Sequence, residues 1–219
     1  MRALLQRNMT SRESLLQSSR LFVALEYGEQ LASHCAQQQA CLFSSVRHRR
    51  FLRSQARQEA FHAQFFKRAA QYIDTGRQFH VPKTLRAFAV RLEDALRRRD
   101  VIETLVGQQI VLESFGATIL EHLNRGMDNQ GIGLRRLRRS ILAQEQAHHA
   151  FGEKVLQQQC RNGSAKIDRL QSLAGEYLGL VDDILVEMSD VFYCLDENPA
   201  NYKAGMLSSL PDWFKGVSR

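Results

Sequence analysis

The residues of this sequence best suited to chemistry form two short motifs, Glu59-x-x-His62 and Glu145-x-x-His148. A carboxylate and an imidazole three residues apart on a helix project from one face, so each motif can supply two ligands to a metal ion. Both motifs lie within a four-three spacing of apolar residues, which is typical of the buried side of a bundle helix. Because an unpaired buried carboxylate is costly, acids at such positions predict bound cations.

Glutamates upstream of each motif can complete the set of ligands. Glu113 lies on an apolar helical face and precedes Glu145 by 32 residues. Two candidates, Glu26 and Glu29, precede Glu59 by 33 and 30 residues. The apolar periodicity around them places Glu29 nearer the middle of the apolar face, whereas the near-equal spacing of the two halves of the chain favours Glu26. We select Glu26 on the symmetry argument, and Glu29 stays open as the alternative.

The elements that must position these residues are helices. Apolar residues recur at helical spacing, good helix formers dominate, and only 3 Pro and 13 Gly occur in 219 residues. We therefore predict an all-α fold. The expected bundle helices cover residues 11–38, 46–73, 101–125 and 133–160, and a short amphipathic helix covers 83–98.

The connections between these helices predict the topology. Short turns join the first helix to the second and the third to the fourth, whereas a long connection separates the second and third. A fifth helix, at 164–195, is expected to pack across the outside of the first or fourth helix. A tail at 196–219 follows, which either folds back or serves a partner. We expect one domain over 1–219 with its core bundle at about 11–160.

At these residues the chain resembles the ferritin-like diiron carboxylate superfamily, in which two helices each supply one Glu and two others each supply a Glu-x-x-His motif. The resemblance covers about residues 11–160 and rests on the order, spacing and helical placement of the motifs. It implies a ferritin-like four-helix bundle with a long crossover between helices 2 and 3 and an additional C-terminal helix. It also implies two iron ions, with manganese as the alternative, since carboxylates and imidazoles suit both metals. The implied ligands are Glu26, Glu59, His62, Glu113, Glu145 and His148.

The resemblance further implies an oxidoreductase, a monooxygenase or oxidase that uses O2 to oxidise an organic substrate, either hydrophobic or linked to a carrier. Phe66 stands where the radical-generating reductase subunits of the superfamily have a tyrosine, which argues against that role. One alternative is iron oxidation or peroxide scavenging, as in ferritins and rubrerythrins. Another is a metal-free helical protein whose basic surface binds RNA or an acidic partner.

Charge and cysteine content bear on the partners. The formal net charge of +7 arises from arginine clusters, of which Arg47, Arg49, Arg50, Arg53 and Arg57 form one. Such patches attract acidic partners, although arginines that cover a solvated helix are the simpler explanation. No Cys-x-x-Cys pair occurs, so we expect an external electron donor in place of a rubredoxin-like domain. The expected protein partner is an acidic carrier or reductase, and a homodimer is one arrangement that the sequence leaves open.

The hydropathy pattern predicts the compartment. No segment approaches the ~18 continuous apolar residues of a membrane span. The first twenty residues lack the apolar core of a secretory signal. We therefore expect no transmembrane segment and a cytoplasmic protein with reduced cysteines.

Overall fold

The computed structural model describes residues 2–212 except 74–75, 77 and 130–134, and every regular element in this part of the chain is a helix. The all-α prediction is confirmed. In chain order the helices are α1 (Arg2–Ala40), α2 (Val46–Ile73), α3 (Lys83–Arg97), α4 (Val101–Leu105), the π-helix η1 (Val106–Leu112), α5 (Glu113–Asn129), α6 (Arg135–Arg161), α7 (Ile167–Glu187), α8 (Ser189–Cys194) and α9 (Pro199–Ser209).

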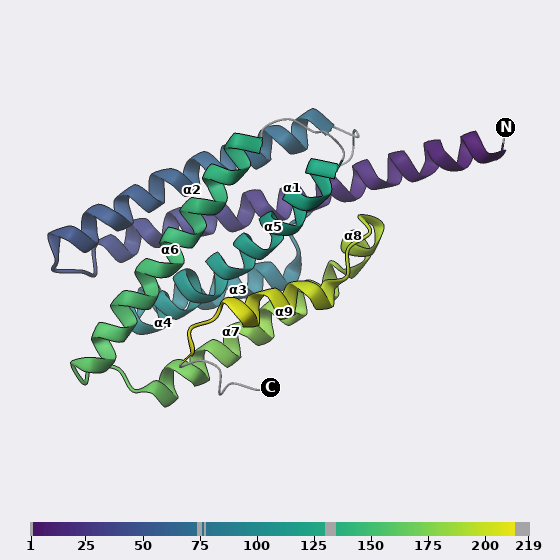
Figure 1. Cartoon of the computed structure of the whole chain (residues 1–219). Coiled ribbons are helices and arrows are strands. Elements are labelled where there is room, and N and C mark those ends of the chain that lie inside the picture. Colours follow the sequence, from purple (N-terminus) through teal and green to yellow (C-terminus); the bar gives the residue numbers. More distant parts are fainter. Residues whose placement is uncertain (1, 74–75, 77, 130–134, 213–219) are drawn as a thin grey trace.

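Long helical rods form a bundle (Figure 1). A cluster of buried Glu and His side chains lies inside it. α1 and α2 pack against each other as an antiparallel pair, and α5 and α6 form a second pair. The rod that contains α5 runs on from α4 through η1 without a break. α3 lies in the crossover between the two pairs. The predicted topology of two hairpins with a long crossover is therefore confirmed.

The bounds of α2 agree with the prediction, because its buried residues follow the helical period closely. Its N-terminus is capped by the hydroxyl of Ser45, which accepts a hydrogen bond from the backbone N–H of His48 at 3.4 Å. α1 is longer than expected and begins at Arg2. The predicted start of the last bundle helix, at 133, lies outside the described residues.

The π-helix was not predicted from the sequence. It is wound with i→i+5 hydrogen bonds, which insert an extra residue into the turn and change which side chains face inward. Gly107 lies in this segment, and a Cβ atom there would be only 2.6 Å from Cζ of Tyr177 on α7. Glycine thus lets α7 approach the π-helix closely.

The C-terminal helices cover one side of the bundle, but only in part where the sequence placed them. The expected helix at 164–195 is divided at Met188 into α7 and α8. α7 packs mainly against α3 and η1, whereas α8 packs against α1 and α9 against α5. The prediction that this segment packs across the outside of the first or fourth bundle helix is confirmed for α8, which packs against α1, but it is wrong for α7, whose apolar face is matched by the amphipathic α3. Residues 213–219 of the predicted tail lie outside the described residues.

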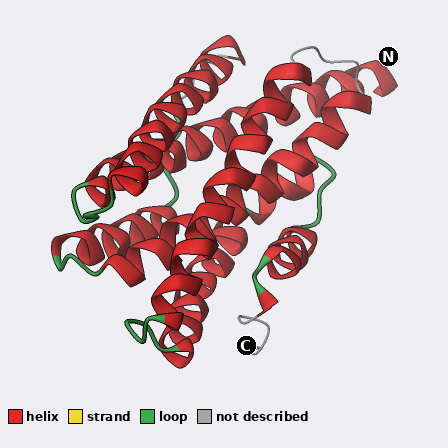
Figure 2. Ribbon diagram, turned by 60° about the vertical axis from the view of Figure 1, so that its left-hand side comes forward, coloured by secondary structure: helices red, strands yellow, loops and turns green. Residues whose placement is uncertain are grey.

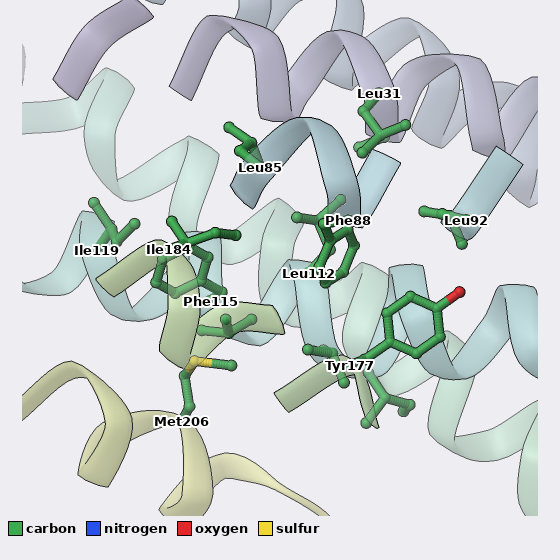
Figure 3. Packing of buried hydrophobic residues seen from close by; sticks show 14 of the residues in the cluster. Leu31, Leu85, Phe88, Leu92, Leu112, Phe115, Ile119, Tyr177, Ile184 and Met206 are labelled. Atoms are coloured by element: carbon green, nitrogen blue, oxygen red, sulfur yellow. The ribbon is translucent and has the colours of Figure 1, made fainter. Parts of the chain in front are cut away.

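An extensive apolar core lies between this cover and the bundle. Side chains from α1, α3, α5, α7 and α9 meet there, among them Leu31, Phe88, Phe115, Tyr177 and Met206 (Figure 3). All five are buried. Figure 2 shows the same helices from a second direction. The core holds α7 and α8 firmly over one side of the polar cluster.

None of the helices in the described ranges is long and apolar enough to cross a membrane. The cytoplasmic location and the single-domain organisation stay predictions.

Candidate metal centre

Two overlapping groups of metal-ligating side chains meet inside the bundle. One group contains Glu29, Glu59, His62 and Glu145, and the other contains Glu59, Glu113, Glu145 and His148. Within each group the ligand atoms lie within 4.8 Å of one another, and every one of these side chains is buried. Glu59 and Glu145 belong to both groups. Two ions placed here would therefore share two carboxylates.

Each rod of the bundle contributes to the cluster. α1 supplies Glu29, and Glu113 is the first residue of α5, immediately after the π-helix. α2 supplies Glu59 with His62, and α6 supplies Glu145 with His148. The structure thus brings together five of the six residues selected from the sequence.

Glu26 is the residue that the structure does not bring into the cluster. Its side chain is partly exposed on α1, and Oε1 accepts a hydrogen bond from Nε2 of Gln30 at 3.0 Å. Glu29 occupies the position in the cluster that was expected of Glu26, and its Oε2 lies 3.4 Å from Nδ1 of His62. The two glutamates differ by about 60° around the helix. The selection of Glu26 is corrected to Glu29, because the centre of the apolar face, and not equal spacing along the chain, decides which side chain points inward.

The imidazoles point their Nδ1 atoms at the carboxylates. Nδ1 of His62 lies 2.9 Å from Glu59 and 3.1 Å from Glu145. Nδ1 of His148 lies 2.7 Å from Glu59 and 3.5 Å from Glu113. Glu59 is therefore the carboxylate that both imidazoles approach.

The opposite ring nitrogens are held by two glutamines in a reciprocal arrangement. Nε2 of His62 on α2 donates to Oε1 of Gln144 on α6 at 2.7 Å. Nε2 of His148 on α6 donates to Oε1 of Gln58 on α2 at 2.8 Å. An amide oxygen can only accept, so Nε2 of each imidazole carries a proton, and Nδ1, which faces the cluster, is the nitrogen left to bind a metal ion. This is the tautomer that a metal-binding histidine needs.

Several buried atoms of the cluster lack a hydrogen-bond partner among the described residues. They are both carboxylate oxygens of Glu59, Oε1 of Glu145, and Nδ1 of His62 and of His148. The short distances between them do not have hydrogen-bonding geometry. Buried polar atoms without a partner are costly, whereas metal ions bound in the two ligand groups would satisfy these atoms. The donor set, carboxylate oxygens with imidazole nitrogens, suits iron or manganese. The residues present fit two such ions.

The electrostatics of the cluster lead to the same conclusion. Burial, together with the charges of Glu145 and Glu59, raises the pKa of Glu29 and Glu113 well above its ordinary value. Burial alone would lower the pKa of His62, but its carboxylate neighbours outweigh this effect and raise the pKa to about 12. Burial alone would raise the pKa of Glu59, but the two imidazoles outweigh it and lower the pKa to about 2. Because four carboxylates are buried this close together, positive charge is needed among them to stabilise their ionised forms.

A chain of buried amides supports Glu113. Nε2 of Gln55 donates to Oε1 of Glu113 at 2.7 Å, and Oε1 of Gln55 accepts from Nε2 of Gln109 at 3.4 Å. Gln109 in turn donates to Gln39 at 2.7 Å. Nε2 of Gln108 donates to the backbone oxygen of Ala32 at 2.9 Å. The π-helix makes this possible, because it turns the consecutive residues Gln108 and Gln109 inward together.

These glutamines were not among the site residues predicted from the sequence. The signal was present, because glutamines at 39, 55, 108 and 109 interrupt apolar helical faces. The motifs themselves are also longer than a Glu and a His, since Gln58 precedes Glu59 and Gln144 precedes Glu145.

An apolar cavity of about 50 Å³ adjoins the carboxylates of Glu29, Glu113 and Glu145. Its other walls come from α1, α3, the end of η1, α5, α7 and α8, and include Leu25, Leu85, Leu112, Phe115, Ile184 and Phe192. A buried water needs ~10–15 Å³ measured in this way, so the cavity has room for O2 or for a small apolar group. The C-terminal helices thus close a space next to the cluster.

Two glycines near the cluster have different roles. Gly116 lines the cavity, and a Cβ atom there would meet only Oε2 of Glu145, at 3.9 Å. A Cβ atom at Gly152, in contrast, would overlap Cβ of Gln109. Gly116 therefore leaves open space, whereas Gly152 permits close contact between α6 and the π-helix.

Among solved structures, the chain is similar to a Synechococcus protein described as having aldehyde deformylating oxidase activity. The TM-score is 0.79, and the match covers 94% of this chain and 91% of that chain at 18% sequence identity. The fold is ferritin-like. The ferritin-like bundle and its buried Glu/His cluster confirm the resemblance noted from the motifs. No family model matches the sequence, and no curated protein matches it.

Proposed function

We propose that this protein is a non-haem diiron oxidase or oxygenase that uses O2 to oxidise an apolar organic substrate. The observation that supports this most strongly is the pair of overlapping ligand groups that share Glu59 and Glu145 beside an apolar cavity. A ferritin-like fold is consistent with the proposal.

The proposed ligands divide between two ions. Glu29 and His62 belong to one group, and Glu113 and His148 belong to the other. Glu59 and Glu145 would bridge the ions. When bound, a pair of ferrous ions supplies electrons to O2, chemistry that no side chain of the cluster can perform.

The chain itself contributes orientation and exclusion of water. Gln58 and Gln144 hold the imidazoles with Nδ1 inward, and Gln55 fixes one oxygen of Glu113. The apolar walls of the cavity keep water from the side of the cluster formed by Glu29 and Glu113. They also favour a substrate with an apolar portion, since an apolar pocket with few polar groups binds such molecules best. The activity of the Synechococcus protein makes an aldehyde the first substrate to test.

The experiment is anaerobic loading with ferrous iron followed by exposure to O2, with and without aldehydes of increasing chain length. The proposal predicts O2 uptake that depends on the organic substrate and on a supply of electrons. Uptake that depends on ferrous iron alone, at the same rate without organic substrate, would favour iron oxidation or peroxide scavenging.

A further inference from the structure

A groove of about 230 Å³ runs between α2 and α6 on the outer surface of the bundle. Its walls include Arg57, Gln58 and Phe61 from α2, and Leu137, Ile141 and Gln144 from α6. The groove and the apolar cavity share no lining residue, because the cavity is lined by residues of α1, α3, η1, α5, α7 and α8 together with Glu145. In the view of Figure 1, α2 lies along the upper edge of the molecule and α7 along the lower edge.

The groove leads directly to the histidines of the cluster. Gln58 and Gln144 line it, and their side-chain oxygens accept the hydrogen bonds from Nε2 of His148 and of His62. A molecule seated in the groove is therefore separated from each imidazole by a single amide side chain. Electron transfer slows steeply with distance, so this is a short route from the surface to the cluster.

On the α2 side of the groove, the exposed charge has one sign. Glu59 is the single acidic residue of α2, and it is fully buried in the cluster. Arg50, Arg53 and Arg57 are exposed on this helix, one turn apart, and none of them forms an ion pair within the described part of the chain. Phe61, one turn beyond Arg57, is 56% exposed. An apolar side chain with a basic border is suited to a partner that has an acidic border around an apolar contact.

We propose that this groove is the docking site of an acidic electron-carrier protein, and that electrons enter by way of Gln58–His148 and Gln144–His62. The inference rests on the proposed function. Each encounter transfers one electron, so one donor molecule is oxidised for each ferric ion that is reduced to the ferrous state. A substrate-bearing carrier is a poorer fit, because the apolar cavity is not reached through the walls of this groove.

The test compares charge reversal at the groove with the same change elsewhere. The groove variant is Arg53→Glu with Arg57→Glu. The control is Arg161→Glu with Lys166→Glu, which alters by the same charge two exposed basic residues, the last residue of α6 and the residue that precedes α7. The probe is a reduced acidic [2Fe–2S] ferredoxin. Binding to each chain is measured by titration, and reduction of the oxidised, iron-loaded protein is measured by anaerobic stopped flow.

The groove variant is expected to bind the ferredoxin more weakly and to be reduced by it at least about 10-fold more slowly at low salt. The control is expected to behave like the wild type. The difference should shrink as salt shortens the Debye length from about 30 Å at 0.01 M to about 8 Å at 0.15 M. Ascorbate with a small mediator should reduce all three proteins at the same rate.

Equal losses in both double variants, or no loss in the groove variant, would overturn the proposal. Binding of a single-stranded RNA oligomer without binding of the ferredoxin would overturn it as well. Failure of the proposed function would be seen separately, as a wild-type chain that does not take up iron, and ferredoxin binding to that chain would still report on the groove.

Discussion

Oε1 of Gln58 on α2 lies 2.8 Å from Nε2 of His148 on α6, so the residue that precedes one Glu-x-x-His motif orients the histidine of the other. Gln144 does the same for His62 at 2.7 Å. The two motifs are therefore one unit, in which each helix positions an imidazole supplied by its neighbour.

Gln58→Leu tests this relationship. The substitution keeps the size of the side chain but removes the acceptor, so His148 loses the bond that fixes its tautomer and ring orientation. Metal affinity should fall by about 10–100-fold, the range typical for partners of metal-binding histidines. Competition against a chelator measures the affinity, and circular dichroism checks the fold. Gln64→Leu, an exposed position on the same helix, is the matched control and should leave affinity unchanged.

Glu29→Gln should remove one carboxylate from the first ligand group while preserving shape. We expect the loss of one of two bound ions, or a large drop in its affinity, because Glu29 belongs to one group alone. Glu26→Gln serves as the control, since Glu26 is partly exposed and bonded to Gln30. Metal analysis after dialysis distinguishes them, and equal metal content in the two variants would argue against Glu29 as a ligand.

Gly28→Leu should narrow the cavity without disturbing the cluster. Gly28 lines the cavity, and a Cβ atom there meets nothing within 4 Å. Iron content should stay at the wild-type level, while turnover of long apolar substrates falls more than turnover of short ones. Gly179→Leu on α7 is the control, because this helical glycine is exposed and equally free of contacts. A uniform loss for all chain lengths would mean that the cavity does not receive the substrate.

Glu187, at the end of α7, is hydrogen-bonded to the first residues of α3. Its carboxylate accepts hydrogen bonds from the backbone N–H groups of Lys83 and Thr84, both at 2.9 Å, and from the Thr84 hydroxyl at 2.6 Å. Glu187→Ala should lower the free energy of unfolding by about 1 kcal/mol at pH 7, as for loss of a helix cap. Asp183→Ala, exposed on the same helix, is the control.

This stabilisation depends on pH in a known direction. The hydrogen bonds from Thr84 lower the pKa of Glu187 below its ordinary value of 4.5. A carboxylate with a lowered pKa in the folded state contributes its full stabilisation above the unfolded pKa and loses it as pH falls. Urea unfolding should therefore show the difference between wild type and Glu187→Ala at pH 7 and a smaller difference below about pH 4. A difference that grows on acidification would contradict the assignment.

Much of the bundle could be predicted because the sequence patterns that specify its helices are local. Apolar residues at helical spacing, with few glycines and prolines, set the extent of α2, and the same period placed both motifs on the buried side. Asp100 stands directly before α4 and caps it, because its carboxylate accepts a hydrogen bond from the backbone N–H of Glu103 at 3.1 Å.

The remaining features depend on contacts between distant segments. Glu26 and Glu29 both lie near the apolar face; the periodicity of that face favours Glu29, and the position of His62 on the next helix shows that Glu29 is the one directed inward. The π-helix leaves only a faint trace in the sequence, the consecutive glutamines Gln108 and Gln109 within an otherwise apolar segment, both of which are buried. α7 and α8 can cover the bundle only because Gly107 leaves room for the side chain of Tyr177. No local periodicity of the sequence reveals this contact between distant residues.

The most direct test of the central claim is an anaerobic titration with ⁵⁷Fe-labelled ferrous iron, followed by oxidation and Mössbauer spectroscopy. Two ions held by ligand groups that share Glu59 and Glu145 should saturate at two iron ions per chain. After oxidation the two ferric ions should be magnetically coupled through the shared carboxylates. Saturation at one iron ion per chain, or two ferric ions without coupling, would contradict the account.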